Sequence, residues 1–224
     1  MPRKGLLIVI EGGDFSGKLV QSNALHNHLS SLSEDNDVIT THEPTNNAKK
    51  LKEKLARDTN PYQDTTKMAE IYIEDRTKHT RRIISPMLEE GVIVIANRYS
   101  MSTCVYQSVQ GIPMDELIET HSEREILTPD LTFLLDISPE EAGKRIMKKH
   151  NTETSVGLDK FERNKNFRNQ VYNRYLDLAC SIPTNPKYQR FFGPVVVING
   201  NNPEKQVTAD IFAKFQPVYD SWII

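Results

Sequence analysis

A glycine-rich loop near the start of the chain joins an apolar strand to a helical pattern. Residues 6–11 read LLIVIE and residues 12–18 read GGDFSGK, which matches the spacing G-x-x-x-x-G-K. Glycine lets the backbone turn tightly, so several N–H groups can face one anion, and the helix that follows adds its positive end. The sequence therefore predicts a loop that binds nucleotide phosphates. Its residues are Gly12, Gly13, Asp14, Phe15, Ser16, Gly17, Lys18 and Leu19.

Two positions decide what this loop can do. Lys18 supplies a mobile positive charge for the outer phosphates. Leu19 stands where the pattern has serine or threonine, whose hydroxyl ligates Mg²⁺. Backbone N–H groups and Lys18 do most of the phosphate binding, so we expect nucleotide binding to persist. We also expect a metal site that differs from the usual one, or weaker catalysis.

Composition limits the partners that the protein can have. The length of 224 residues suits one domain over residues 1–224. A net charge of −2 gives no general attraction to nucleic acid or acidic membranes, and no apolar run approaches the ~20 residues of a membrane span. Cys104 and Cys180 lack metal-ligand spacing, so we expect reduced thiols in a cytoplasmic protein.

Continuous apolar runs alternate with helical patterns along the chain. The expected strands are residues 5–11, 37–41, 92–96, 131–136 and 195–198. The expected helices are residues 17–32, 47–57, 65–90, 102–107, 114–125, 138–150, 159–181 and 203–215. Buried strands of this kind imply a parallel sheet covered on both faces. We therefore predict a three-layer α/β fold with a five-stranded parallel sheet flanked by helices.

Polar side chains follow four of the expected strands. They are the loop at residues 12–18, Glu43-Pro44, Asn97-Arg98-Tyr99 and Asp136. Ligands of parallel α/β sheets bind beyond the carboxyl ends of the strands. Arg98 suits a phosphate because its planar guanidinium donates two parallel hydrogen bonds. We predict that these groups share one site at one edge of the sheet.

Two pairs of an aromatic and a polar residue lie on expected helices. Tyr72 and Arg76 are four residues apart, so they share a helix face. Tyr106 directly precedes Gln107, whose amide can read the edge of a base. Taken alone, the first pair is more simply explained as core packing, and the second is explained equally well that way.

Charged residues flank a polar loop at residues 151–158. They are Arg145, Lys148, Lys149, Lys160, Glu162 and Arg163. A mobile segment between bases can close over phosphates, so we predict a mobile lid at about residues 149–160. A solvated charged loop is the alternative.

Together, these motifs resemble the thymidylate kinase family of P-loop nucleoside monophosphate kinases. The similarity runs from about Gly5 to Phe212 and keeps the motifs in order: IEGGDFSGK, HEPT, the DR of EIYIEDR, NRYSMSTCVYQ, PDLTFLLD with SPEEAGKR, and DKFE. NRYSMSTCVYQ is similar to the family's D-R-x-x-x-S-x-x-A-Y-Q and is the most specific motif after the loop. The resemblance implies the P-loop NTPase fold and transfer of the γ-phosphate of ATP to dTMP with Mg²⁺.

The resemblance also implies a role for each matching residue on the acceptor side. Arg98 would hold the acceptor phosphate, and Tyr72 would stack on thymine where the family usually has phenylalanine. Tyr106 would lie where a ribose 2′-hydroxyl would go, and would favour deoxyribose. The implied acceptor residues are Asp14, Glu43, Pro44, Tyr72, Arg76, Arg98, Ser102, Tyr106 and Gln107.

On the donor side, the resemblance implies that Lys18 holds the phosphates and Arg145 lies along the adenine. Lys18, Arg98 and Asp14 would be catalytic, and Asp14 and Glu162 would hold Mg²⁺. The family places a catalytic arginine in the loop or in the lid. Phe15 occupies that loop position and residues 151–158 contain no arginine. The candidates are therefore Lys148, Lys149, Lys160 and Arg163.

Two departures from the family pattern leave alternatives open. Leu19 replaces the hydroxyl residue and Asn97 replaces the aspartate before arginine, and both positions concern Mg²⁺. One alternative is a kinase for another deoxynucleotide or a deoxynucleoside. The other is a nucleotide-binding protein with impaired catalysis. The resemblance further implies a homodimer whose partners are ATP and dTMP, with no nucleic acid and no membrane.

Overall fold

A computed structural model describes residues 4–32, 37–46, 48, 60–150 and 160–223 of the chain. Its parallel sheet has five strands in the order β2-β3-β1-β4-β5. The strands are β1 (Leu7–Glu11), β2 (Val38–His42), β3 (Ile93–Asn97), β4 (Leu131–Asp136) and β5 (Val195–Asn199). This sheet confirms the predicted fold class, and each strand begins and ends within two residues of its predicted bounds.

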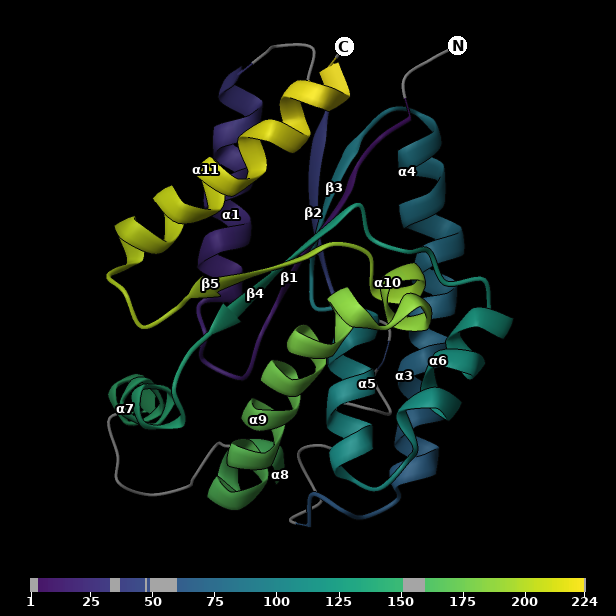
Figure 1. Ribbon diagram of the computed structural model, residues 1–224, viewed down its shortest axis with the longest axis vertical. Coiled ribbons are helices and arrows are strands. Elements are labelled where there is room, and N and C mark those ends of the chain that lie inside the picture. The colour runs from purple at the N-terminus through teal and green to yellow at the C-terminus, as the bar shows by residue number, and fades with distance from the viewer. Residues whose placement is uncertain (1–3, 33–36, 47, 49–59, 151–159, 224) are drawn as a thin grey trace.

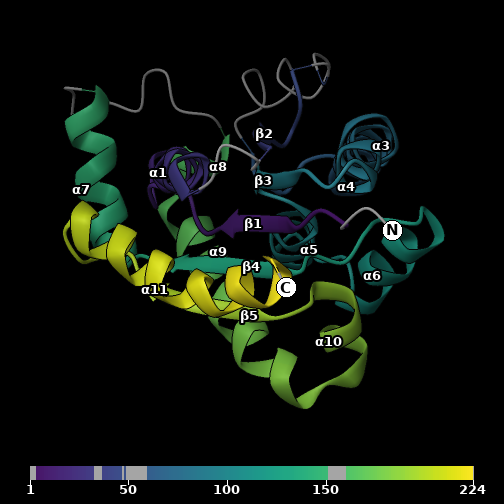
Figure 2. The same cartoon turned by 90° about the horizontal axis from the view of Figure 1, so that it is seen from above.

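Helices cover both faces of the sheet (Figures 1 and 2). Ile8 and Ile10 of β1 pack with α1 (Lys18–Leu32) and α11 (Glu204–Ile223) on one face. Leu7 and Val9 point to the opposite face, as alternate residues of a strand do. The helices on that side are α3 (Thr65–His79), α4 (Ser85–Glu89), α5 (Ser100–Val109), α6 (Met114–Glu123), α9 (Lys165–Ser181) and α10 (Pro186–Phe192).

Helix α9 is fixed to the core by side chains along one of its faces. Phe167, Val171 and Tyr175 are each no more than 3% exposed and pack with residues of α5. Burying a large apolar side chain contributes about 1.5–3 kcal/mol. Residues that lie between these positions on α9 are therefore held in a fixed place relative to the sheet.

The predicted helix at residues 159–181 is wrong at its start. It is two helices, α8 (Lys160–Arg163) and α9, because Asn164 ends the first and caps the second. The Asn164 side chain accepts a hydrogen bond from the N–H of Phe167 at 2.9 Å, which is the usual N-cap interaction. The break lets Phe161 of α8 turn back against Phe167, with ring centroids 5.1 Å apart.

Other helices differ from prediction at their ends or in their regularity. Thr80–Ile84 forms a π-helical turn between α3 and α4, inside the region predicted as one helix. Helix α11 continues to Ile223, past the predicted end at residue 215, although it contains Pro217. The short helices at Ile182–Thr184 and Pro186–Phe192 were not predicted. The predicted helix at 47–57 lies outside the described residues apart from Ala48.

The polar loop at 151–158 also lies outside the described residues. Helix α7 (Pro139–His150) ends directly before it, as predicted.

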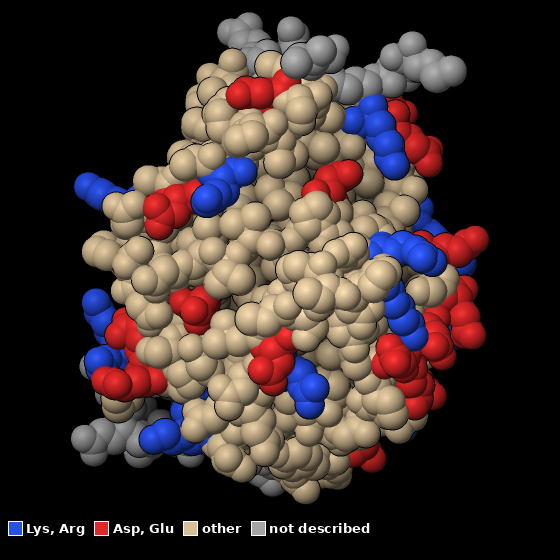
Figure 3. Space-filling view, viewed as in Figure 1, with Lys and Arg blue, Asp and Glu red and all other residues tan. Residues whose placement is uncertain are grey.

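On the face seen in Figure 3, charged side chains of both signs lie mostly toward the rim. Among the helices that the structure describes, none has the length and apolar character needed to cross a bilayer.

Candidate active site

The loop after β1 has the backbone needed to surround an anion. Gly12 has a φ of 141°, and a Cβ there would lie 2.8 Å from the carbonyl oxygen of Leu135, so only glycine fits. Lys18 Nζ donates to the carbonyl oxygens of Gly12 at 3.1 Å and Gly13 at 2.6 Å. The ammonium group is thus held against the loop itself.

The surroundings of Lys18 make its charge sensitive to what the loop binds. Burial, together with the charge of Arg98, lowers the pKa of Lys18 to about 7, although Asp14 and Glu11 act in the opposite direction. A phosphate at the loop would place negative charge beside the ammonium group and favour its charged form. Protonation of Lys18 and binding of an anion are therefore coupled.

All nine residues predicted for the acceptor line a single cavity. They come from the loop, the ends of β2 and β3, and helices α3 and α5. Thr103 of α5 and Phe161 of α8 line it too, and neither was predicted. Thr103 directly follows Ser102 in NRYSMSTCVYQ, and Phe161 lies inside DKFE. Both residues therefore belong to motifs that the sequence already showed.

Arg98 and Asp14 form the boundary between this cavity and the loop. Arg98 Nη2 donates to Asp14 Oδ1, and Nη1 donates to Ser102 Oγ at 3.0 Å. The Tyr106 hydroxyl donates to Asp14 Oδ2 at 3.0 Å. Burial alone would raise the pKa of Asp14, but the charges of Arg98 and Lys18 and the bond from Tyr106 outweigh it and lower that pKa. Asp14 is therefore ionised at neutral pH.

Glu11 is a structural member of the site that the sequence did not reveal. It is fully buried at the end of β1. Its Oε1 accepts from the N–H groups of Tyr99 at 2.8 Å and Ser102 at 3.0 Å, and its Oε2 accepts from Ser102 Oγ at 2.6 Å and the Tyr175 hydroxyl at 3.1 Å. This carboxylate fixes the start of α5 and the middle of α9 to the strand that carries the loop. The sequence did contain one indication of this role, because Glu11 is a charged residue at the end of an apolar strand.

Arg76 is more deeply engaged in the protein than predicted. It is 2% exposed, and its Nε donates to Glu43 Oε2 at 2.6 Å. Its Nη1 contacts Thr103 Oγ1 and His121 Nε2, and its Nη2 donates to the carbonyl oxygen of Tyr99. These contacts use four of its five N–H groups. Arg76 lines the acceptor cavity, so contact with a base stays a prediction that rests on one remaining donor.

His121 completes this buried network as a neutral group. Burial and the charge of Arg76 lower the pKa of His121 to about 3. Its Nε2 can therefore accept from Arg76 while its Nδ1 faces the Leu117 carbonyl oxygen at 2.6 Å. The network holds the floor of the acceptor cavity rigidly.

Arg145 lies beside the loop, where it was predicted to contact the donor. Its Nη1 donates to the carbonyl oxygen of Phe15 at 3.4 Å and its Nη2 to that of Gly200 at 2.9 Å. Glu141 Oε1 accepts from Nε at 3.1 Å. The guanidinium plane is thus fixed next to the loop, and its contact with adenine stays a prediction.

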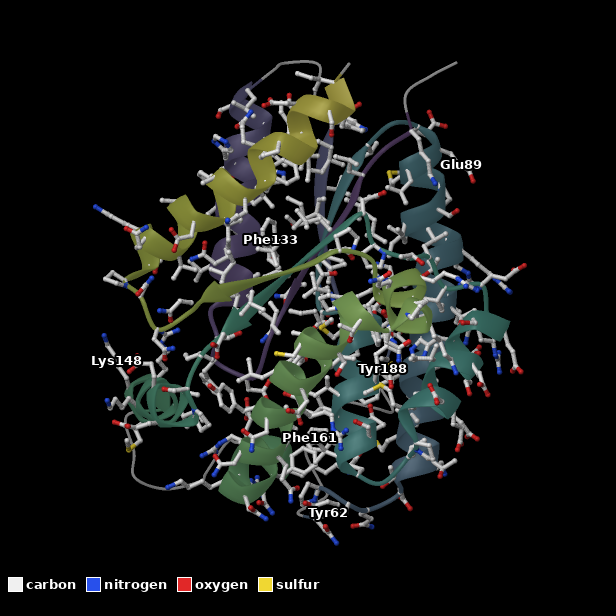
Figure 4. All side chains as sticks on the ribbon, in the orientation of Figure 1. Tyr62, Glu89, Phe133, Lys148, Phe161 and Tyr188 are labelled. Atoms are coloured by element: carbon white, nitrogen blue, oxygen red, sulfur yellow. The ribbon has the colours of Figure 1, made fainter. Side chains whose placement is uncertain are left out.

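The residues predicted to flank a lid are placed differently from one another. Lys148 is exposed on α7, well away from Phe161 of α8 (Figure 4), and Arg163 is exposed on α8. Lys160 is fully buried, with Nζ donating to the Gln63 carbonyl oxygen at 3.3 Å. That burial differs from the prediction of a base over the phosphates. The side chain of Lys149 lies outside the description, and Glu162 is half-buried.

A second cavity adjoins the first. Both are lined by Asp14, Tyr106 and Phe161. It extends from Gly13 along the end of β4 to Arg168 of α9. The loop, the parallel sheet and two cavities that meet at Asp14 define a P-loop nucleotide-binding protein.

Comparison with known proteins identifies the family. A family model described as thymidylate kinase matches residues 10–211. A thymidylate kinase of Dinoroseobacter shibae is 33% identical over 218 residues, which cover 95% of this chain and 97% of that protein. One of Wolbachia pipientis is 34% identical over 181 residues, 80% of this chain and 87% of that protein. One of Desulfotalea psychrophila is 35% identical over 153 residues, 67% and 73% respectively. The chain belongs to the thymidylate kinase family.

Proposed function

We propose that this protein is a phosphotransferase that moves the γ-phosphoryl group of ATP to dTMP, giving ADP and dTDP. The observation that carries the proposal is the convergence on one cavity next to the loop of the nine residues that the family resemblance implied for the acceptor. Family membership supports the same reaction.

The reaction needs positioning and charge neutralisation by the protein, with no covalent intermediate. An oxygen of the acceptor phosphate attacks the γ-phosphorus in line and forms a new P–O bond. The bond between that phosphorus and the β–γ bridging oxygen breaks, and its electron pair stays on ADP. Lys18 and the loop N–H groups bind the donor phosphates, while Arg98 binds the acceptor phosphate. Asp14 orients Arg98 through their ion pair.

Gln107 supplies a group that fits a pyrimidine base. Its Nε2 donates to Gln110 Oε1 at 2.9 Å, and its Oε1 is buried without a hydrogen-bond partner among the described residues. A buried acceptor without a partner costs about 1–3 kcal/mol. An N–H donor on the edge of thymine would satisfy it, and Tyr72 lines the same cavity with an aromatic face.

Tyr106 supports a preference for deoxyribose. Its hydroxyl is bound to Asp14, and its ring lies 5.4 Å from the centre of the Arg98 guanidinium. The ring is fixed against Phe161 at 5.4 Å, so it cannot easily move aside. A 2′-hydroxyl placed against this ring would find no room.

The residues around the loop fit Mg²⁺ held mainly by phosphates and water. Mg²⁺ prefers oxygen ligands and commonly takes one or two carboxylates from a protein. Asp14 is ionised. Asp136 lies in the second cavity, which Asp14 also lines, and its Oδ1 is buried without a hydrogen-bond partner in the described ranges. Asp14 would hold the ion, with Glu162 as the second carboxylate. When bound, the ion would neutralise charge on the phosphates.

The wider organisation is part of the same proposal. Family membership supports a homodimer, and the motif order supports one kinase domain over residues 1–224 with a mobile lid at about 149–160. The unpaired Cys104 and Cys180 support a cytoplasmic location. Light scattering on the purified protein tests the dimer.

A coupled assay of ADP release tests the main proposal. ATP is supplied with dTMP, dUMP, other deoxynucleoside monophosphates, and thymidine. We expect the highest kcat/KM with dTMP. A higher value with a nucleoside, or hydrolysis of ATP without an acceptor product, would contradict the assignment.

A further inference from the structure

The loop has Phe15 where the family can have a catalytic arginine, and residues 151–158 contain no arginine. Arg168 of α9 is an arginine that lies beside the loop instead. It lies one turn into α9, between the buried anchors Phe167 and Val171. It lines the second cavity together with Gly13 and Asp14 of the loop. Since α9 is tied to β1 through the bond between Tyr175 and Glu11, Arg168 is held in a fixed relation to the phosphate-binding loop.

The guanidinium of Arg168 is only partly used by the protein. One end donates to the carbonyl oxygen of Glu162. Its Nε is buried and has no hydrogen-bond partner among the described residues. A buried cationic donor without a partner is costly, and the cost is removed if an anion binds beside it.

The electrostatics of the site agree with that placement. Burial lowers the pKa of Arg168, and the charges of Asp14 and Glu162 oppose the shift. Arg168 therefore lies within electrostatic reach of the carboxylate that already holds Arg98. Lys18 of α1 and Arg98 at the end of β3 donate to carbonyl oxygens of the loop, and Arg168 of α9 lines the cavity that begins at Gly13.

We infer that Arg168 is a catalytic residue that contacts the γ-phosphoryl group during its transfer. The inference rests on the proposed kinase function. As the bond to the bridging oxygen breaks and the bond to the acceptor oxygen forms, negative charge spreads over the equatorial oxygens of the phosphoryl group. Arg168 donates hydrogen bonds to these oxygens through its free N–H groups, and no proton is transferred. A rigid helix thus supplies the charge for which the loop has Phe15.

Substitution of Arg168 by glutamine tests the inference by kinetics. Arg168→Gln keeps hydrogen-bonding capacity and removes the charge, and we expect kcat with ATP and dTMP to fall by about 100-fold or more. Arg168→Lys restores the charge without the planar fork and should recover part of the loss. Arg174→Gln is the matched control, because Arg174 is exposed on the same helix. It should leave kcat and KM close to those of the wild type.

Nucleotide affinities give a second test that needs no turnover. A contact with the γ-phosphate should make Arg168→Gln lose at least about tenfold in affinity for ATP, while ADP affinity and Tm stay close to wild-type values. An unchanged kcat, or equal losses for ATP and ADP with a lowered Tm, would show that Arg168 has only a structural role. If the wild type phosphorylates no nucleotide, the proposed function fails, and the comparison of ATP with ADP still decides whether Arg168 contacts the γ-phosphate.

Discussion

The acceptor side and the metal side of this site are built in different ways. The acceptor cavity is lined by residues of packed elements, and its floor is the buried network of Arg76, Glu43 and His121. On the metal side, Leu19 and Asn97 replace the family's oxygen and charge, and Leu19 is 63% exposed. The cavity beside the loop is lined by Arg168, a cationic residue outside the family motifs quoted above.

This difference shows where substitution is tolerated. A side chain in a hydrogen-bonded floor cannot change alone, because its partners would be left buried without hydrogen bonds. A ligand of a metal that is held mainly by phosphates and water can be lost, because water or a neighbouring carboxylate can take its place. We therefore expect strict recognition of the acceptor together with loose control of Mg²⁺, and five experiments test that contrast.

Loss of Lys18 should have the largest effect. Lys18→Ala removes the full charge at the loop, and we expect kcat to fall by at least ~100-fold. Lys214→Ala on the exposed side of α11 is the control and should change kcat little. Steady-state kinetics with ATP and dTMP measure both. Near-native turnover of Lys18→Ala would contradict the role of Lys18 in binding the donor phosphates.

The pH dependence of nucleotide binding should be the next largest effect. The pKa of Lys18 is lowered to about 7 in the free protein, and phosphate binds to the charged form. Affinity for ADP should therefore fall by up to about tenfold for each pH unit above 7, and Lys18→Met should abolish that slope. Calorimetry between pH 7 and 9 measures it, and an equal slope in both proteins would contradict the coupling.

The same shift gives the sign of a stability effect. The unfolded chain has Lys18 at its ordinary pKa of 10.5, so it binds more protons than the folded protein between pH 7 and 10.5. The contribution of Lys18 to stability therefore rises with pH across that window. Consequently, Lys18→Met should raise Tm more at pH 7 than at pH 10.

Gln107 tests the acceptor side. Gln107→Leu removes the acceptor that lacks a partner, and we expect KM for dTMP to rise by roughly tenfold because a buried hydrogen bond to the base is worth about 1–3 kcal/mol. Tm should change little, because removal of the buried Oε1, which has no partner among the described residues, offsets the lost hydrogen bond from Gln107 Nε2 to Gln110. Gln216→Leu on the exposed face of α11 serves as the control. An unchanged KM would show that the base lies elsewhere.

Restoring the metal side should have the smallest effect. Leu19→Thr with Asn97→Asp supplies the missing hydroxyl and charge. Because the ion gains oxygen ligands, the Mg²⁺ concentration for half-maximal activity should fall by roughly a few-fold. Leu32→Thr, at the other end of α1, is the control. Ordinary sub-millimolar activation of the wild type by Mg²⁺ would show that the two departures do not weaken the metal site.

The sequence predicts those parts of the molecule whose signals are local. The strands were found because they are continuous apolar runs, and the loop and acceptor residues lie in contiguous motifs at strand ends or on one helix face. Helix α10 was missed because seven residues beginning with proline show too little periodicity. Arg168 was missed because its place in the cavity that Gly13 and Asp14 also line depends on how α9 packs. The hydrogen bond from Tyr175 to Glu11 depends on the same packing.

The carboxylate of Glu11 joins three stretches of chain that are distant in sequence, at β1, at Tyr99–Ser102 and at Tyr175. All of the hydrogen bonds of this carboxylate form only after α9 has docked on the sheet. A chain truncated before Tyr175 would keep the glycine motif, yet the strand that carries it would lack the anchor that α9 provides.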